Sequence, residues 1–166
     1  MSTQYGFSFA KDRCVQCYGC EVACKSWRNG ETGVRWRRVS NIWYGRYPNV
    51  KNGSASVSCM HCADPECVKT CPVKAIAKRA EDGIVVVDRE KCIGCKICLK
   101  SCPFGTPQFG TDGKMQKCDM CLGLVELGKE APPCAETCPT KALTLAKMDE
   151  QRKGATEQDM KKLLAG

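Results

Sequence analysis

Three features that often reveal a protein's partners are missing from this sequence. No apolar run is long enough to span a membrane, which takes about 20 predominantly apolar residues. The first residues, MSTQYGFSFAKDRC, contain no apolar segment of the kind found in secretory signal peptides. No run of five or more basic residues occurs, which weighs against nucleic-acid binding. We therefore expect no nucleic-acid partner, no direct membrane insertion, and membrane contact only through another subunit.

Cysteine, by contrast, is abundant and regularly spaced. The 16 cysteines of the 166-residue chain form four groups of four. In every group two residues separate the first and second cysteines, and three separate the third and fourth. The middle gap is two residues in the first and third groups, four in the second and twelve in the fourth. The groups are Cys14, Cys17, Cys20, Cys24; Cys59, Cys62, Cys67, Cys71; Cys92, Cys95, Cys98, Cys102; and Cys118, Cys121, Cys134, Cys138.

The third group, with Pro103 after it, has the bacterial ferredoxin spacing C-x2-C-x2-C-x3-C-P. Three thiolates on a tight loop can hold three corners of a cubane cluster. The fourth lies one helical turn farther on, on a segment that leads away from the loop. In two-cluster ferredoxins the fourth cysteine therefore ligates the other cluster. Count and spacing predict four [4Fe–4S] clusters with no thiol left over.

Zinc and disulfides are the competing interpretations of these cysteines. Zinc sites usually join two C-x2-C pairs across a longer gap, whereas two of these groups place three cysteines within seven residues. Disulfide frameworks are typical of small secreted chains. His61, the only histidine, lies inside the loop of the second group. We expect it to hydrogen-bond there rather than to ligate, because the thiols suffice.

The basic charge balance can be explained by the clusters. Lys and Arg exceed Asp and Glu by 26 to 18, a formal net charge of +8. Sixteen thiolate ligands would add 16 negative charges. Four oxidised cluster cores of about +2 each would offset roughly half of these, so that the net charge of the protein with its clusters is near zero. The lysines beside ligands are expected either to raise cluster potentials or to be ordinary surface charges; they are Lys69, Lys74, Lys96, Lys100, Lys117 and Lys141.

A repeated segment predicts how the groups combine. CPVKAI at 71–76 recurs as CPTKAL at 138–143, and each copy leads into a strand-like stretch. After the first copy, a glycine turn and the run 84–88 predict a hairpin that delivers the chain to Cys92. The second and third groups thus form one two-cluster module. The first and fourth groups flank it in the sequence, so they can form a second module only if the chain closes around the first one. We predict an α+β fold of two ferredoxin-like modules, one inserted in the other. The outer module comprises residues 1–53 and 105–147, the inner one 54–104, and a short helical tail 148–166.

Applying the crossed ligation rule of two-cluster ferredoxins assigns each sulfur to a cluster. We number each cluster by the cysteine group that supplies three of its ligands, so that the inner module holds clusters 2 and 3. The sets are Cys14, Cys17, Cys20, Cys138 for cluster 1; Cys59, Cys62, Cys67, Cys102 for cluster 2; Cys92, Cys95, Cys98, Cys71 for cluster 3; and Cys118, Cys121, Cys134, Cys24 for cluster 4.

Two segments outside the ligand groups have open roles. Thr156–Asp159 can cap a short helix with Met160, Leu163 and Leu164 on one side, which either docks a partner or lies on its own domain. The 34 residues between Cys24 and Cys59 are rich in arginine and aromatics and hold all three tryptophans. Such residues serve as interface anchors, pack between modules, or stack on bases. We favour docking to a partner through Trp27, Trp36 and Trp43.

The chain resembles the four-cluster electron-transfer subunits of molybdopterin oxidoreductases, most closely the iron–sulfur subunit of dimethyl sulfoxide reductase and of polysulfide, thiosulfate and tetrathionate reductases. The motifs that carry the resemblance are TQYGF at 3–7, CEVACK at 20–25, SCMHCADPEC at 58–67, DGIVVVD at 82–88, CPFGTPQF at 102–109, and KCDMC at 117–121 with GK at 128–129 before PPC at 132–134.

The resemblance implies a non-catalytic subunit that relays single electrons between a molybdenum or tungsten catalytic subunit and another redox partner, commonly a membrane anchor. It also implies that the outer module faces the catalytic subunit. A free polyferredoxin, or the iron–sulfur subunit of a hydrogenase or formate-linked complex, is the alternative. The aromatic insertion favours a fixed partner. Without its own signal the chain is expected in the cytoplasm, or exported on the partner's signal, and peripheral to the membrane where an anchor is present.

Overall fold

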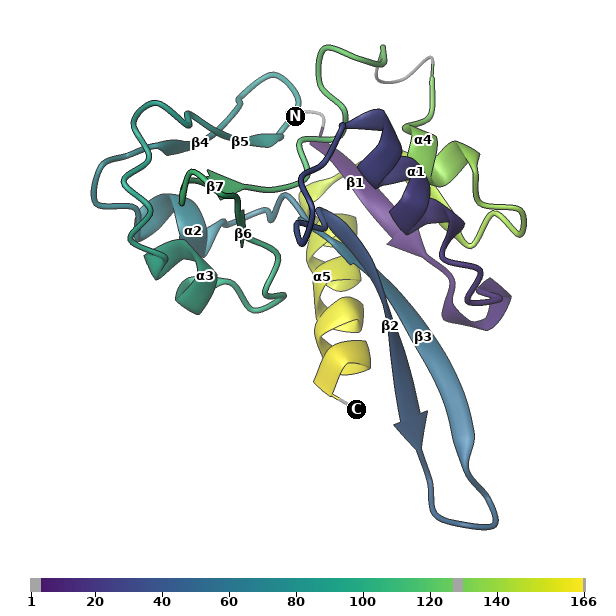
Figure 1. Cartoon of the computed structure of the whole chain (residues 1–166). Helices are drawn as coiled ribbons and strands as arrows, with labels where there is room; N and C mark the ends of the chain where they lie inside the picture. The colour runs from purple at the N-terminus through teal and green to yellow at the C-terminus, as the bar shows by residue number, and fades with distance from the viewer. Residues whose placement is uncertain (1–3, 127–129, 166) are drawn as a thin grey trace.

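Short helices and strands separated by cysteine-rich loops make up the computed structural model, which describes residues 4–126 and 130–165 (Figure 1). The strands are β1 (Gln4–Phe9), β2 (Arg37–Tyr44), β3 (Lys51–Ser58), β4 (Ile76–Lys78), β5 (Val85–Val87), β6 (Gln108–Phe109), β7 (Met115–Gln116) and β8 (Leu143–Met148). The helices are a 3-10 turn at Lys11–Arg13, α1 (Gly19–Trp27), α2 (Glu66–Lys69), α3 (Ile97–Ser101), α4 (Pro133–Glu136) and α5 (Glu150–Ala165). Thr3, Gly128 and Lys129 of the motifs above lie outside the described residues. The mixture of helices and strands is as predicted.

The strands pair two by two in antiparallel ladders: β1 with β8, β2 with β3, β4 with β5, and β6 with β7. The β4–β5 pair confirms the hairpin predicted after the first CPxKA segment. β8 confirms the strand expected after the second copy, and its partner β1 comes from the start of the chain. Two segments far apart in sequence thus lie side by side.

The helices that follow the ligand loops also pair. α1 packs against α4, which joins the first and fourth cysteine groups, and α2 packs against α3, which joins the second and third. In Figure 1, α2, α3 and β4–β7 lie on one side of the molecule, and α1, α4 and β1 lie on the other. A core of Phe7, Ile84, Met120 and Leu143, together with buried cysteines, joins the two sides.

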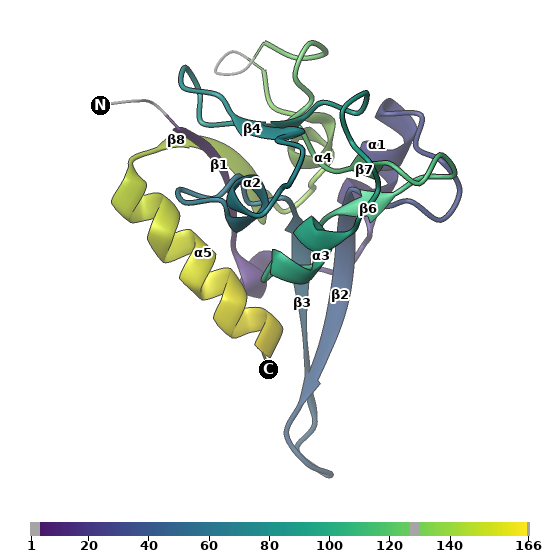
Figure 2. The same cartoon turned by 90° about the vertical axis from the view of Figure 1, so that its left-hand side faces the viewer.

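The segment between the first two cysteine groups forms a long hairpin, β2–β3, whose tip points away from the rest of the molecule (Figures 1 and 2). The base of this hairpin is buried, since every residue from Ser54 to Ser58 is at most 4% exposed. β3 runs through position 53/54, where the sequence placed a boundary between modules.

The C-terminal helix was predicted, but its predicted start was wrong. α5 begins at Glu150, so Thr156 lies inside the helix and does not cap it. The residues before Thr156 are mostly good helix formers, which let the helix extend back towards β8. Met160, Leu163 and Leu164 pack on Ala55 and Val57 of β3, with Met60 and Phe104, and the Glu157 carboxylate accepts the Ala63 N–H at 2.9 Å. This packing fits a helix that lies on its own domain. None of the helices in the described part of the chain has the length and apolar character needed to cross a bilayer.

Candidate metal centres

All four ligand loops share one backbone feature. The residue just before the second cysteine has a positive φ in every group: Gln16 (56°), His61 (48°), Gly94 (70°) and Met120 (57°). A left-handed residue at this point turns the chain back on itself, so that the flanking cysteines face the same space. At Gly94 a side chain is also excluded, because a Cβ would lie 2.5 Å from the carbonyl oxygen of Gly113. The four groups are therefore repeats of one loop geometry.

The cysteines assigned to cluster 1 line a single small cavity. Cys14, Cys17 and Cys20 surround it together with Cys138, which is contributed by the far end of the sequence. Val15, Tyr18 and Thr140 are among the other lining residues. The pairing of β1 with β8 and of α1 with α4 places Cys138 there. Three sulfurs from one loop and one from another is the arrangement that the crossed rule describes.

The electrostatic neighbours of the buried thiols include the sulfurs with which the sequence analysis grouped them. Burial raises the pKa of Cys24 to about 12, and thiolates of Cys118, Cys134 and Cys121 act in the same direction, while Arg37 opposes them. Burial likewise raises the pKa of Cys98 to about 11, together with Cys95, Cys92 and Cys71. The sulfurs assigned to clusters 4 and 3 thus lie close enough to interact.

The cluster 2 sulfurs behave in the same way. Burial raises the pKa of Cys67 to about 11, with Cys59 and Cys102 among the thiolates that add to it. The pKa of Cys62 is raised by burial, by Glu157, and by Cys59, Cys102 and Cys67. Crowded, buried thiols of this kind resist ionising by themselves, and bound iron would supply the positive charge that lets them do so.

No three His, Cys, Asp or Glu side chains among residues 4–126 and 130–165 come close enough together to hold a single metal ion. A single zinc ion needs all four sulfurs within about 2.3 Å of one point. A cubane instead presents four separate iron atoms, one to each cysteine.

Hydrogen-bond donors approach many of the sulfurs. Backbone N–H groups of Ala75, Met115 and Met120 donate to Cys71, Cys92 and Cys118 at 3.3, 3.3 and 3.4 Å. The hydroxyls of Ser56 and Thr106 lie 3.4 Å from the sulfurs of Cys20 and Cys102. At Cys138, burial alone would raise the pKa, but the backbone of Leu143 and the hydroxyl of Thr140 lower it overall. Donors to ligand sulfur favour the more negative, reduced state of a cluster.

Two cations and the histidine are buried among these sulfurs. Arg37, the first residue of β2, is 1% exposed and Lys117 is 4% exposed. Lys117 Nζ donates to the carbonyls of Val85 and Cys118. His61 Nδ1 accepts the N–H of Val85 at 2.9 Å, which bears out its expected hydrogen-bonding role. Five of the six lysines singled out from the sequence are instead exposed: Lys69, Lys74, Lys96, Lys100 and Lys141.

Arg37 was missed by the sequence analysis because it lies in a stretch with several arginines. Its signal is the alternation along β2, in which Arg37 and Val39 are both buried while Arg38 and Ser40 are not. A period of two places these residues on one face of a strand. Noticing that the charged residue shared a face with valine would have identified it.

The three tryptophans have different surroundings. Trp27, at the end of α1, is 56% exposed, and Trp43, near the tip of the β2–β3 hairpin, is 67% exposed. Trp36 is partly buried: its Nε1–H donates to Gln116 Oε1 at 2.9 Å, and the Arg28 guanidinium lies 5.1 Å from its ring centroid.

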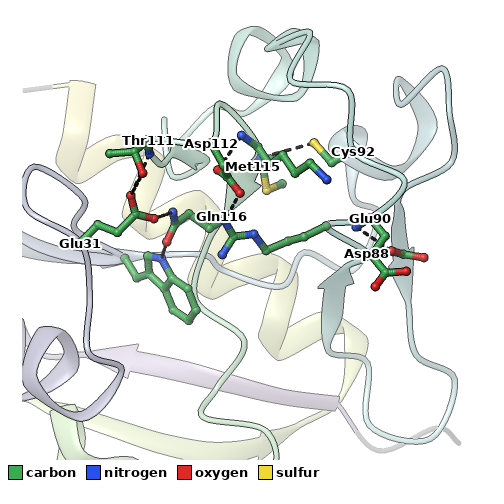
Figure 3. A network of polar contacts seen from close by, with 11 residues as sticks. Glu31, Asp88, Glu90, Cys92, Thr111, Asp112, Met115 and Gln116 are labelled. Carbon is green, nitrogen blue, oxygen red and sulfur yellow. Dashed lines mark hydrogen bonds and ion pairs between the residues drawn. The ribbon is translucent and has the colours of Figure 1, made fainter.

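Gln116 belongs to a polar network that joins the segment before β2 to the β6–β7 hairpin (Figure 3). Glu31 accepts hydrogen bonds from Gln116 Nε2 at 2.8 Å and from the backbone N–H and hydroxyl of Thr111 at 2.8 and 2.9 Å. The Thr111 backbone and the Gln116 side chain lower the pKa of Glu31. The contacts of Trp36 and Glu31 therefore fit the alternative of packing within the chain.

Comparisons with known proteins agree on the type of protein. A family described as a 4Fe-4S dicluster domain matches residues 51–148, and one described as a 4Fe-4S binding domain matches residues 11–32. One chain of the anaerobic dimethyl sulfoxide reductase of Escherichia coli is 44% identical, with 92% of this chain and 78% of the relative covered. The formate dehydrogenase iron-sulfur subunit of Wolinella succinogenes is 42% identical, covering 82% and 78%. One subunit of the sulfite dehydrogenase of Allochromatium vinosum is 33% identical, covering 84% and 67%.

Proposed function

Because the chain belongs to the 4Fe-4S dicluster family of iron–sulfur subunits, we propose that it conducts single electrons through four [4Fe–4S] clusters between a molybdopterin-containing catalytic subunit and a second redox partner. It is an electron-transfer subunit of an oxidoreductase complex. The clusters supply the redox change, and the chain holds their ligands, excludes water and sets their electrostatic surroundings. It performs no bond chemistry of its own.

The ligand sets are those of the crossed rule, and the two modules are nested. Support comes from the helix pairs α1–α4 and α2–α3, from the closure of β1 on β8, and from the sulfur neighbours within each set. The boundary between the two modules, predicted at residues 53/54, falls inside β3. It is better placed at the base of the β2–β3 hairpin. The β6–β7 hairpin, assigned to the outer module, also supports the inner one, since Met115 N–H donates to Cys92.

The observation that carries the proposal is the order in which the sulfur sets adjoin. Cluster 1 and cluster 4 ligands share Arg37 as a neighbour. Cys118 of cluster 4 interacts with Cys59 of cluster 2, and Cys67 of cluster 2 interacts with Cys98 of cluster 3. This gives a row in the order 1, 4, 2, 3. An electron can therefore pass from each cluster to its neighbour without leaving the protein.

Exposure of the cysteines agrees with such a row. Of the sixteen cysteines only Cys17 and Cys95 are exposed, and they belong to clusters 1 and 3, at its two ends. All four cysteines of cluster 4 are buried. Electrons then enter and leave at the ends, while cluster 4, inside the row, is shielded from solvent.

We assign the cluster 1 end to the catalytic subunit and the cluster 3 end to the second partner. The β2–β3 hairpin projects from the rest of the molecule (Figures 1 and 2). Its exposed residues Trp43, Tyr44, Tyr47 and Val50 are mostly aromatic, as in the cores of protein interfaces. Trp27, at the end of α1, is a separate exposed aromatic residue, whereas the Nε1–H of Trp36 is bound to Gln116 within the chain. The chain meets a membrane only through an anchor subunit, and a free polyferredoxin would not need this arm.

Isolation of the native complex tests the proposal. We expect a large molybdenum- or tungsten-containing chain in stoichiometric amount, and about 16 iron atoms for each copy of this chain. A chain that purifies alone, without molybdenum or tungsten, and exchanges electrons with many partners would support the polyferredoxin alternative.

A further inference from the structure

Arg37 is a buried cation in apolar surroundings. Its guanidinium carbon lies 4.3 Å from the centroid of the Phe7 ring, and its Nη1 donates to Ser56 Oγ at 3.0 Å. None of the ion pairs between described residues includes it. Burying an arginine without a carboxylate is costly, so its charge needs another counterpart.

That counterpart is sulfur from two clusters. Burial alone would lower the pKa of Arg37, but the Cys134, Cys118, Cys20 and Cys24 thiolates outweigh it and raise the pKa. Cys20 belongs to the proposed cluster 1, and the other three belong to cluster 4. Arg37 therefore lies where the two sets meet.

Two of its three nitrogen atoms have no hydrogen-bond partner among residues 4–126 and 130–165. Nε and Nη2 are both inaccessible to solvent and make no hydrogen bond. Unpaired buried donors on a charged group are among the most unfavourable features a fold can keep. Ligand sulfur and the sulfide of an adjoining cubane are acceptors that would satisfy them.

The third donor reaches cluster 1 through Ser56. The Ser56 oxygen accepts the Arg37 Nη1–H and lies 3.4 Å from the Cys20 sulfur. A Cys20 thiolate that ligates a cluster carries no proton, so the hydroxyl would be the donor in this contact. Arg37 is thus connected to cluster 1 by a defined hydrogen-bonded path, and it lies over Phe7, which belongs to the same core cluster as Cys24, Cys118 and Cys134 of cluster 4.

We propose that Arg37 is a positioning residue for electron transfer, a fixed positive charge shared by clusters 1 and 4 that raises the reduction potentials of both and leaves clusters 2 and 3 unaffected. It favours the state in which either cluster of the outer pair holds an electron. No bond forms or breaks: one electron moves between the two clusters while Arg37 stays protonated. The inference rests on the ligand sets of the proposed function.

The test is a redox titration of the intact complex, followed by electron paramagnetic resonance, for four variants of this chain. Arg37→Met removes the charge and Arg37→Lys keeps it. Ser56→Ala removes only the connection to Cys20. Arg35→Met is the matched control, since Arg35 is exposed and pairs with Glu21.

We expect Arg37→Met to shift the reduction equilibria of clusters 1 and 4 by about tenfold or more, or about 59 mV for one electron, to lower potential. Arg37→Lys should recover part of the shift. Ser56→Ala should lower cluster 1 alone, and Arg35→Met should change neither, because exposed charges are screened by solvent.

Unchanged potentials of clusters 1 and 4 in Arg37→Met, or equal shifts in all four clusters, would overturn the inference. If Arg37→Met does not assemble, the Ser56→Ala variant provides the test. An unchanged potential of cluster 1 in that variant would then overturn the inference. Iron content and the number of cluster signals in the unmodified complex are measured first. A count other than four clusters counts against the proposed function, whereas four clusters without the selective shift count against Arg37 alone.

Discussion

Replacing Lys117 with methionine should lower the potentials of clusters 2 and 4. Lys117 is 4% exposed, and its charge acts on Cys59 and Cys67 of cluster 2 and on Cys118 of cluster 4. Methionine keeps most of the volume of the side chain and removes the charge. The reduced clusters, which carry one more negative charge, then lose a nearby cation.

The size of the effect follows from Coulomb's law. At a separation of about 8 Å and an effective dielectric constant of about 20, one unit charge contributes about 2 kcal/mol. For a one-electron couple, where a tenfold change corresponds to 59 mV, this is about 90 mV. The carbonyls of Val85 and Cys118 also lose their donor, which costs about 1–3 kcal/mol of folding stability.

The assay is a redox titration of the complex with each cluster followed by its paramagnetic signal. Lys69→Met is the matched control, because Lys69 is 49% exposed and pairs with Asp64 and Glu66. Clusters 2 and 4 should shift to lower potential in Lys117→Met, and neither should move in Lys69→Met. Unshifted clusters in Lys117→Met, or the same shift in both variants, would refute the assignment of Lys117 to the junction between these clusters.

Three further outcomes are expected. Trp43→Ser together with Trp27→Ser should weaken binding of the catalytic subunit without loss of iron, measured by co-purification and metal analysis; iron loss with binding intact would contradict the docking role. Because the folded pKa of Glu31 is lowered, its stabilisation is present above the unfolded value of about 4.3 and is lost as pH falls through the folded value. The protection factor of the Thr111 amide, its hydrogen-exchange rate compared with the intrinsic rate at the same pH, should therefore fall in that range. Glu31→Gln should remove this pH dependence. Met160→Ala, at a buried site where α5 packs on β3, should destabilise the chain by about 2–5 kcal/mol in thermal unfolding; an unchanged transition would show that the packing of α5 on β3 does not stabilise the fold.

Local patterns predicted the elements that local residues determine. The β4–β5 hairpin follows from the run of β-branched residues at 84–87 after a glycine turn, and the cysteine spacing predicted the ligand loops. The β2–β3 hairpin was not predicted because β3 reads KNGSASVS, a polar sequence with little strand propensity. Its base is buried because α5 and the loop after Cys102 cover it, which is a tertiary effect.

The surroundings of the proposed clusters could be predicted less well than the ligands. The spacing of the cysteines and the crossed rule are enough to propose the ligand groups, because the geometry of each loop depends on residues that are close in sequence. Arg37, Ser56 and Lys117 come from strands and a loop that approach the sulfurs only after the fold has closed. Nothing in the sequence around Lys117 separates it from the five exposed lysines that also lie near ligands.

Replacement of Cys138 by serine tests the central claim, crossed ligation by nested modules, most directly. The substitution is read out in the isolated complex by iron content and by the signals of the individual clusters. The account predicts that the cluster held by Cys14, Cys17 and Cys20 is altered or lost, while the cluster held by Cys118, Cys121 and Cys134 keeps its signal. Loss of the Cys118 cluster with the N-terminal cluster intact would contradict it.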